Sequence, residues 1–110
     1  MFDTTYLIVP DVVAHDKDLL PLDKLLLGLI YSLTKQNGYC WASNKYLGEY
    51  LCQSASHISK SLKRLEDKGY INREIDNRKM NKDRRKVYVD IEYINKLQYG
   101  IKKRDDSLSL

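Results

Sequence analysis

The sequence predicts one α+β domain in which three helices are followed by a β-hairpin and a final helix. The first observation behind this prediction is a pair of apolar runs at helical spacing, Leu47–Leu51 and Ile58–Leu65, separated by only a few residues. The second is a pair of short β-rich runs on either side of a polar loop, all of them after Gly69. With 110 residues, of which 43% are hydrophobic, the chain has room for one modest core.

Residues 1–20 are interpreted as an N-terminal arm and linker with a turn of helix. Within them Thr4–Val9 favours an extended arm or an edge strand, because it is rich in strand-forming residues and ends at Pro10. Pro21 suits the first turn of a central core helix, where its missing amide costs nothing. Gly28 in that helix costs about 1 kcal/mol relative to alanine, so we expect another backbone to pack closely against it. The expected core face of this helix consists of Leu22, Leu25, Leu26, Leu29, Ile30 and Leu33.

A turn at Asn37-Gly38 ends this first helical region. Residues 39–42 follow as a short strand-like piece. Trp41 is the sole tryptophan. We expect its ring to fill the core, which is the usual place for a large aromatic side chain.

Capping residues set the limits of the next two helices. Ser43 precedes the first of them, and its hydroxyl can accept a hydrogen bond from an unpaired amide of the first turn. Ser54 or Ser56 can serve the second helix in the same way. Gly69 ends it, because glycine adopts the left-handed backbone of a C-cap without a steric penalty. Two helices joined by so short a turn must cross steeply and share one core.

The outward face of the second helix changes character along its length. Residues near its start are small and able to form hydrogen bonds, which suits the approach of a helix to base edges. Residues further along are long and cationic, which suits phosphates. The alternative is an ordinary solvated helix face, since serine and lysine are common there. The candidate DNA-binding residues are Ser54, Ala55, Ser56, His57, Ser59, Lys60, Lys63 and Arg64, together with Asn44 and Lys45 at the start of the preceding helix.

A β-hairpin with a basic tip, or wing, is predicted between Tyr70 and Asp90. Its loop, residues 76–86, carries six cations, which would repel one another unless solvated or paired with phosphates. The alternative is a plain solvated loop. From Gln53 to Tyr88 there are eleven Lys or Arg against five Asp or Glu, whereas the remainder of the chain is net acidic. This local positive charge favours a polyanionic partner. The candidate wing contacts are Arg78, Lys79, Lys82, Arg84 and Arg85.

The winged domain is therefore expected over residues 21–90, with a separate helix over residues 91–101 and a frayed polar tail over residues 102–110. The helix has apolar residues at Ile94, Leu97 and Ile101. Two roles are open for it: packing on the core helix or contact with a second copy of the chain.

Other classes of function have little support in the sequence. Cys40 and Cys52 lack the spacing of a zinc motif, even when His15 and His57 are added, so neither a metal nor another cofactor is expected. No phosphate-cradling glycine loop or paired carboxylates in an apolar setting indicate an enzyme. A Cys52–His57 pair is better interpreted as packing. No apolar run is long enough to cross a bilayer and no targeting segment is visible, so a cytoplasmic protein is expected.

Several motifs resemble the winged helix-turn-helix domains of bacterial plasmid and phage replication initiators and replisome organisers. The resemblance covers about residues 5 to 90. Its segment from Leu62 to Ile71 is shared by many winged helices, and its Gly38–Ser43 piece is more telling of the replication group. The quoted motifs are Tyr6 to Pro10, Lys24-Leu25-Leu26, Asn37-Gly38-Tyr39-Cys40-Trp41-Ala42-Ser43-Asn44, Leu47, and Ser59-Lys60-Ser61-Leu62-Lys63-Arg64-Leu65-Glu66-Asp67-Lys68-Gly69-Tyr70-Ile71.

What the resemblance implies is origin or operator binding, often as a dimer and with further domains, so the chain is either a fragment or a stand-alone regulator. The leading hypothesis is sequence-specific binding to double-stranded DNA at a plasmid or phage replication origin. The alternative is an operator-binding transcriptional regulator, and a protein-interaction adaptor is less favoured. The expected partners are duplex DNA and a second copy bound through the arm or residues 91–101, with no membrane and no small-molecule substrate.

Overall fold

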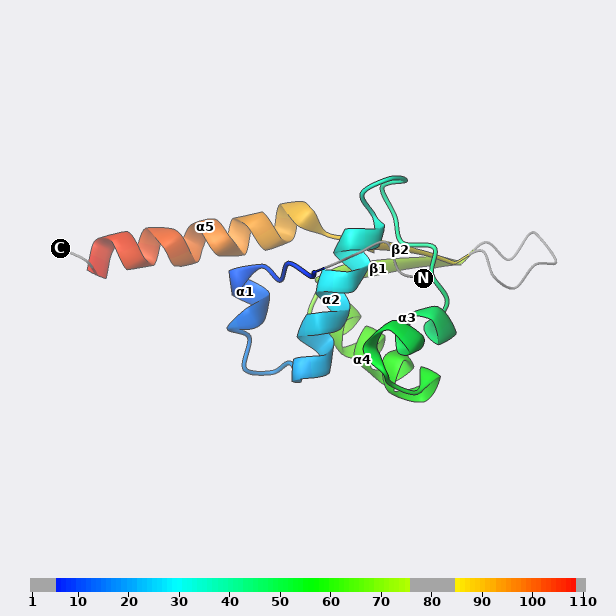
Figure 1. The fold of residues 1–110 in the computed structure, drawn as a ribbon. Coiled ribbons are helices and arrows are strands. Elements are labelled where there is room, and N and C mark those ends of the chain that lie inside the picture. The colour runs from blue at the N-terminus through cyan, green and yellow to red at the C-terminus, as the bar shows by residue number, and fades with distance from the viewer. Residues whose placement is uncertain (1–5, 76–84, 109–110) are drawn as a thin grey trace.

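The computed structural model describes residues 6–75 and 85–108, except for the side chains of residues 101–108 (Figure 1). The shorter helices gather beside a two-stranded hairpin, and a long last helix extends away from this body. This arrangement is a winged helix-turn-helix fold, as the sequence predicts. The elements are α1 (Asp11–Ala14), α2 (Pro21–Leu33), α3 (Asn44–Leu51), α4 (Ala55–Asp67), β1 (Ile71–Ile75), β2 (Arg85–Val89) and α5 (Ile91–Leu108).

The core lies where α2, α3 and α4 meet the hairpin. The buried face of α2 is broader than the spacing of its apolar residues indicates, because α3, α4 and β2 all pack against this helix. Leu27 is fully buried although it lies outside the expected face, and Leu25, which was expected in the core, is 46% exposed. The other fully buried apolar side chains of the three helices are Leu26, Leu29, Ile30, Leu47, Ile58, Leu62 and Leu65.

The N-terminal arm crosses α2 at Gly28. A Cβ atom on Gly28 would lie 3.1 Å from the carbonyl oxygen of Ile8 and 3.2 Å from Cγ2 of Val9. The close backbone packing expected at this glycine is therefore confirmed. The described part of the arm, residues 6–10, is not part of a sheet, so the edge-strand alternative is wrong there. α1 follows as the expected helical turn, and it contributes buried Val13 to the core.

The hairpin pairs β1 and β2 antiparallel, with Ile71 opposite Val89 and Ile75 opposite Arg85. Cys40 forms a β-bridge to Val87 on the other edge of β2, which confirms the strand-like piece before α3. Ile71 is fully buried, whereas Ile75 is 62% exposed because the strand there has run beyond the core.

Trp41 does not fill the core. Its side chain is 50% exposed, and its ring centroid lies 5.6 Å from that of Tyr46 on α3. The expectation of a core residue is wrong because its neighbours Cys40 and Ala42 take the inward positions, both fully buried. Successive residues of an extended chain point to opposite faces, so Trp41 points outward.

α5 continues to Leu108 instead of ending at Ile101, so the structure gives residues 102–108 a helical backbone where a frayed tail was expected. No proline interrupts this segment, and its Lys and Arg residues favour helix. Its main neighbour is α1 rather than α2, with Ile94 buried at 3% exposure. None of the described helices is both long and apolar enough to span a bilayer.

Candidate nucleic-acid interface

The turn between α3 and α4 is closed by backbone contacts. Cys52 takes a left-handed conformation with φ of 58°, and the amide of Gln53 donates to the carbonyl oxygen of Gly48 at 2.8 Å. A Cβ atom on Gly48 would collide with the carbonyl oxygen of Gln53. The turn therefore requires a glycine at this position of α3, a need that the sequence pattern did not reveal.

Hydroxyl caps begin both helices of the pair. The Ser43 hydroxyl accepts from the amide of Tyr46 at 3.1 Å, and the Ser54 hydroxyl accepts from the amide of His57 at 3.1 Å. Ser54 rather than Ser56 is thus the cap of α4. Neither helix has an acidic residue in its first turn. The positive ends of the two helix dipoles are therefore not neutralised by a carboxylate of their own first turn.

Gly69 ends α4 as expected, with φ of 83°. The amide of Tyr70 donates to the carbonyl oxygen of Leu65, and the amide of Gly69 donates to that of Glu66, both at 3.0 Å. This pair of bonds is a Schellman motif, which satisfies carbonyls that the last helical turn leaves open. β1 then starts directly from the end of α4, and the Arg73 guanidinium forks onto the Glu66 carboxylate to join the two elements.

Seven of the eight α4 candidates are exposed. Lys63 among them forms an exposed ion pair with Asp67 at 2.8 Å, and hydrogen bonding to that carboxylate raises the pKa of Lys63. Such a surface pair contributes little to stability and leaves the lysine available to another anion. Lys45, near the start of α3, is exposed as well. The exposed α4 residues are Ser54, Ala55, Ser56, His57, Ser59, Lys60 and Lys63.

Arg64 is the exception, because it reaches inward. Its Nε atom donates to Oδ2 of Asp23 at 2.8 Å and its Nη2 atom donates to Oδ1 at 2.9 Å. This bidentate pair joins α4 to α2, and it raises the pKa of Arg64. The Arg64 side chain is 34% exposed to solvent. The bidentate pair holds α4 against α2, a contact that the predicted role of Arg64 in DNA binding did not include.

Asp23 is fully buried, yet each of its oxygens has partners. The Ser61 hydroxyl and the amide of Leu20 donate to it in addition to Arg64. Burial opposes ionisation and would raise the pKa of Asp23, but these hydrogen bonds outweigh it and lower the pKa below its usual value. The carboxylate thus satisfies the backbone amide of Leu20 just before α2, and it fixes α4 against α2.

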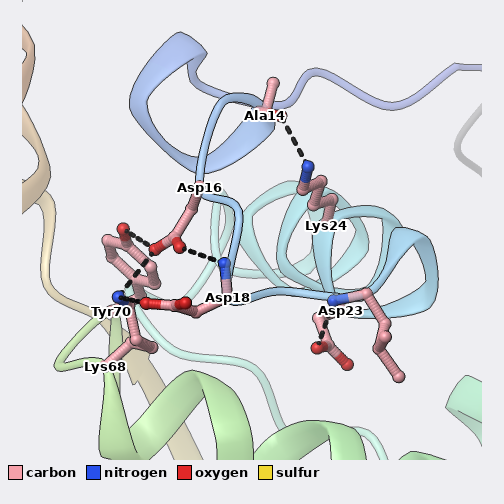
Figure 2. A network of polar contacts seen from close by, with 8 residues as sticks. Ala14, Asp16, Asp18, Asp23, Lys24, Lys68 and Tyr70 are labelled. Carbon is pink, nitrogen blue, oxygen red and sulfur yellow. Dashed lines mark hydrogen bonds and ion pairs between the residues drawn. The ribbon is translucent and has the colours of Figure 1, made fainter.

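A second polar cluster ties the linker after α1 to the end of α4 (Figure 2). The Lys68 ammonium lies 3.2 Å from the carboxylate of Asp16 and 3.0 Å from that of Asp18. The Tyr70 hydroxyl donates to Asp16 at 2.6 Å. Burial and this bond to a carboxylate raise the pKa of Tyr70. The sequence indicates these carboxylate partners only indirectly, because acidic residues outnumber basic residues outside residues 53–88.

Arg85 holds the base of the wing to the start of α3. Its Nη1 atom donates to the side-chain oxygen of Asn44 and its Nη2 atom to the carbonyl oxygen of Ala42, both at 2.6 Å. Burial lowers the pKa of Arg85. Two predicted DNA contacts, Arg85 and Asn44, are therefore bonded to each other. The wing candidates Arg78, Lys79, Lys82 and Arg84 lie outside the described residues.

The described residues offer no group of three or more His, Cys, Asp or Glu side chains that could hold a metal ion. Cys40 is buried and Cys52 is exposed. Burial raises the pKa of the Cys40 thiol, which keeps it in its less reactive neutral form. The chemistry available at the exposed surface of α4 is hydrogen bonding and ion pairing.

Comparison with known proteins agrees with the helix-turn-helix arrangement of α3 and α4. A helix-turn-helix domain family matches residues 17–71, half of the chain. Among solved structures, Staphylococcus aureus MepR bound to ethidium bromide is 18% identical with a TM-score of 0.54, covering 91% of this chain and 69% of that chain. The S. aureus MepR–DNA complex is 19% identical with a TM-score of 0.51, covering 83% and 63%.

A MepR mutant bound to an oligodeoxyribonucleotide is 18% identical with a TM-score of 0.56, covering 91% of this chain and 70% of that chain. No curated protein matches the sequence. Likeness at these identities concerns the fold. The match over residues 17–71 includes α2, α3 and α4 with the turn between them, and the chain belongs to this helix-turn-helix domain family.

Proposed function

We propose that the chain binds double-stranded DNA with sequence preference and acts as an operator-binding transcription regulator. The observation that carries this proposal is the exposed outer face of α4, which is small and polar at its start and cationic further along. That helix is fixed from behind by Asp23 through Ser61 and Arg64. A rigidly held helix with such a face suits insertion into a major groove.

In this proposal the first turns of α4 read base edges, and lysines contact phosphates. The base-reading residues are within Ser54–Ser59, and the phosphate contacts are Lys60, Lys63 and Lys45. Arg64, Arg85 and Asn44 position the interface through the contacts described above. The proposed wing contacts to phosphates or a minor groove are Arg78, Lys79, Lys82 and Arg84.

The choice of an operator over a replication origin rests on the similar structures. MepR is described as a transcription regulator of the multidrug efflux pump MepA of S. aureus. Origin binding, the leading hypothesis from the sequence, has no comparable support in the helix-turn-helix match or in these structures. Footprinting on the source replicon separates the two roles. Protection of a promoter operator agrees with the proposal, and protection of repeats at an origin contradicts it.

DNA binding is tested with variants of α4. Lys60→Ala should weaken binding to all duplexes alike and lower the slope of log K against log salt by about 1, because one phosphate contact is lost. Ser56→Ala or His57→Ala should instead change the preference among sequences. Fluorescence anisotropy of labelled duplexes measures both effects.

Lys35→Ala is a matched control, because this lysine is exposed and lies after the end of α2, outside α3, α4 and the hairpin. It should leave affinity and salt slope unchanged. A protein-interaction adaptor would not bind random duplex at low salt at all. If the variants on α4 bind every duplex as the unaltered protein does, α4 is not the reading element.

We further propose that a second copy of the chain covers the apolar surface formed by the arm and the start of α5. Tyr6, Ile8 and Ile91 are exposed there by 71%, 55% and 45%. Ile8 and Ile91 border a groove of about 200 Å³ that Tyr31 and Ile94 also line. A two-fold dimer would carry two α4 helices, and two such helices suit the two half-sites of a palindromic operator.

Sedimentation equilibrium at micromolar concentration tests this dimer. Ile8→Glu should shift the protein to monomer, because it places a charge in the apolar groove. Leu25→Glu alters a side chain of similar exposure on α2 and should leave the dimer intact. A monomeric unaltered protein, or dissociation by both variants alike, contradicts the proposed interface.

A further inference from the structure

Trp41 is a large aromatic side chain exposed beside the proposed interface. It is 50% exposed although the core of this chain accepts many large apolar residues. One side of its ring packs on Tyr46. Its neighbours in sequence serve the fold directly, Cys40 by pairing with β2 and Ser43 by capping α3. Trp41 itself therefore has a smaller structural role than the residues around it.

The segment that carries Trp41 is held rigidly on both sides. The Arg85 guanidinium binds the carbonyl oxygen of Ala42 and the side chain of Asn44. On the other side, Cys40 exchanges two backbone hydrogen bonds with Val87, at 2.8 and 2.9 Å. Trp41 thus lies between the base of the wing and the start of α3, and both of these elements fix its position.

The surroundings of Trp41 are suited to an anion. Exposed Lys45 is on the first turn of α3, which has no acidic residue there. Arg85 adds a second cation on the wing side, where its guanidinium binds Asn44 and the carbonyl oxygen of Ala42. Tryptophan combines an apolar ring with an N–H group that only donates hydrogen bonds. Sugar and phosphate groups of nucleic acid offer the matching apolar faces and acceptors.

We propose that Trp41 contacts the sugar–phosphate backbone of bound duplex DNA, flanking the segment that α4 reads. Its indole N–H donates to a phosphate oxygen, its ring covers a deoxyribose, and Lys45 neutralises the same stretch of backbone. Trp41 is a positioning contact that fixes the register of α4 without reading sequence. This inference rests on the proposed DNA binding and adds a contact that neither α4 nor the wing supplies.

Because Trp41 is the sole tryptophan, its fluorescence reports this one site. Adding a duplex of the footprinted sequence should change the tryptophan emission and reduce its quenching by acrylamide, since the backbone would cover the exposed half of the ring. The unaltered protein is used, so this readout does not depend on a variant folding. Anisotropy of a labelled duplex in the same sample records binding independently.

Trp41→Ala should weaken binding about tenfold for all duplexes alike, the effect of losing one hydrogen bond and its packing. Trp41→Phe should recover part of the affinity, because it keeps a ring but loses the N–H donor. Leu25→Ala truncates a side chain of similar exposure on α2 and should have no effect. Thermal unfolding of each variant verifies that it is folded.

The outcomes separate this inference from the proposal on which it rests. Absence of any anisotropy change with the unaltered protein contradicts DNA binding itself. Binding by anisotropy with unchanged acrylamide quenching of Trp41 overturns the inference alone. If folded Trp41→Ala binds DNA with full affinity, the inference is also overturned, and the role of Trp41 is limited to packing on Tyr46.

Discussion

At the scale of single residues, Asp23 determines how the proposed DNA-reading helix is held. An unpaired buried carboxylate would be costly, but this one accepts hydrogen bonds from Ser61 and Arg64 of α4. The sequence pattern did not reveal this role, because the partners lie 38 and 41 residues away. For the same reason the spacing places Arg64 at the flank of the outward face, without showing that its guanidinium binds Asp23.

We expect Arg64→Ala to destabilise the fold more than Asp23→Ala. The first variant leaves a buried carboxylate without its main partner and should cost about 3–5 kcal/mol. The second should cost less, about 1–3 kcal/mol, because the Arg64 guanidinium retains access to water while the Ser61 hydroxyl and the Leu20 amide lose their acceptor. Urea unfolding of both variants and of the double variant gives the free energies of unfolding.

The double variant should cost less than the sum of the two single variants, because the second loss removes no further bond between them. Lys63→Ala breaks an exposed pair on the same helix and should leave the midpoint of unfolding unchanged. Additive losses for Asp23 and Arg64 would contradict their coupling.

At the scale of elements, the turn between α3 and α4 is set by one close backbone approach. The carbonyl of Gln53 occupies the space that a side chain at position 48 would need. In the sequence, Gly48 is a glycine inside a predicted helix, where it lowers the helix propensity. The sequence does not show why a glycine is needed there. The explanation depends on where the chain goes after Cys52, and tertiary geometry decides that.

Gly48→Ala is expected to destabilise the protein by about 1–3 kcal/mol, because the turn must move to admit the methyl group. Gly100→Ala is the matched control. Gly100 lies within α5, and a Cβ atom there would meet nothing within 4 Å outside its own stretch of helix, so alanine should stabilise by about 0.5–1 kcal/mol. Thermal and urea unfolding measure both, and equal effects of the two variants would contradict the steric argument.

At the scale of the whole molecule, ion pairs and hydrogen bonds join elements that are far apart in the chain. Asp16 receives the Tyr70 hydroxyl and the Lys68 ammonium, which attach the linker after α1 to the end of α4. Glu66 receives the Arg73 guanidinium across the junction of α4 and β1. Burial opposes ionisation of Asp16, but its hydrogen bonds outweigh this and lower its pKa. The bond from Arg73 lowers the pKa of Glu66.

The stability of the protein should therefore fall in acid. A carboxylate whose pKa is lower in the folded than in the unfolded state stabilises the fold above its unfolded value, and this contribution is lost as the pH falls through the folded value. Asp16, Asp23 and Glu66 all follow this sign. The melting temperature should change little from about pH 7 to 5 and fall below about pH 4.

Circular dichroism melts between these pH values measure the effect. Asp23→Asn should make the melting temperature fall less steeply with decreasing pH, since it removes one of the titrating groups. A melting temperature that stays constant down to about pH 2 would contradict the role of these carboxylates.

The sequence by itself determined the order of the helices and the hairpin and the caps at Ser43 and Gly69, because these depend on local spacing and on residues that act within one turn. It left the cap of α4 open between Ser54 and Ser56 and ended the last helix too early. It also located the outer face of α4, because a helix with one apolar stripe must turn its polar side outward. The tertiary structure alone decided that Trp41 is exposed, that Leu27 rather than Leu25 is buried, that Arg64 binds Asp23, and that Arg85 binds Asn44. Trp41 points outward because its neighbours Cys40 and Ala42 take the inward positions of the extended segment. The other outcomes depend on elements that lie far away in the sequence, and local spacing and composition do not specify which distant elements meet.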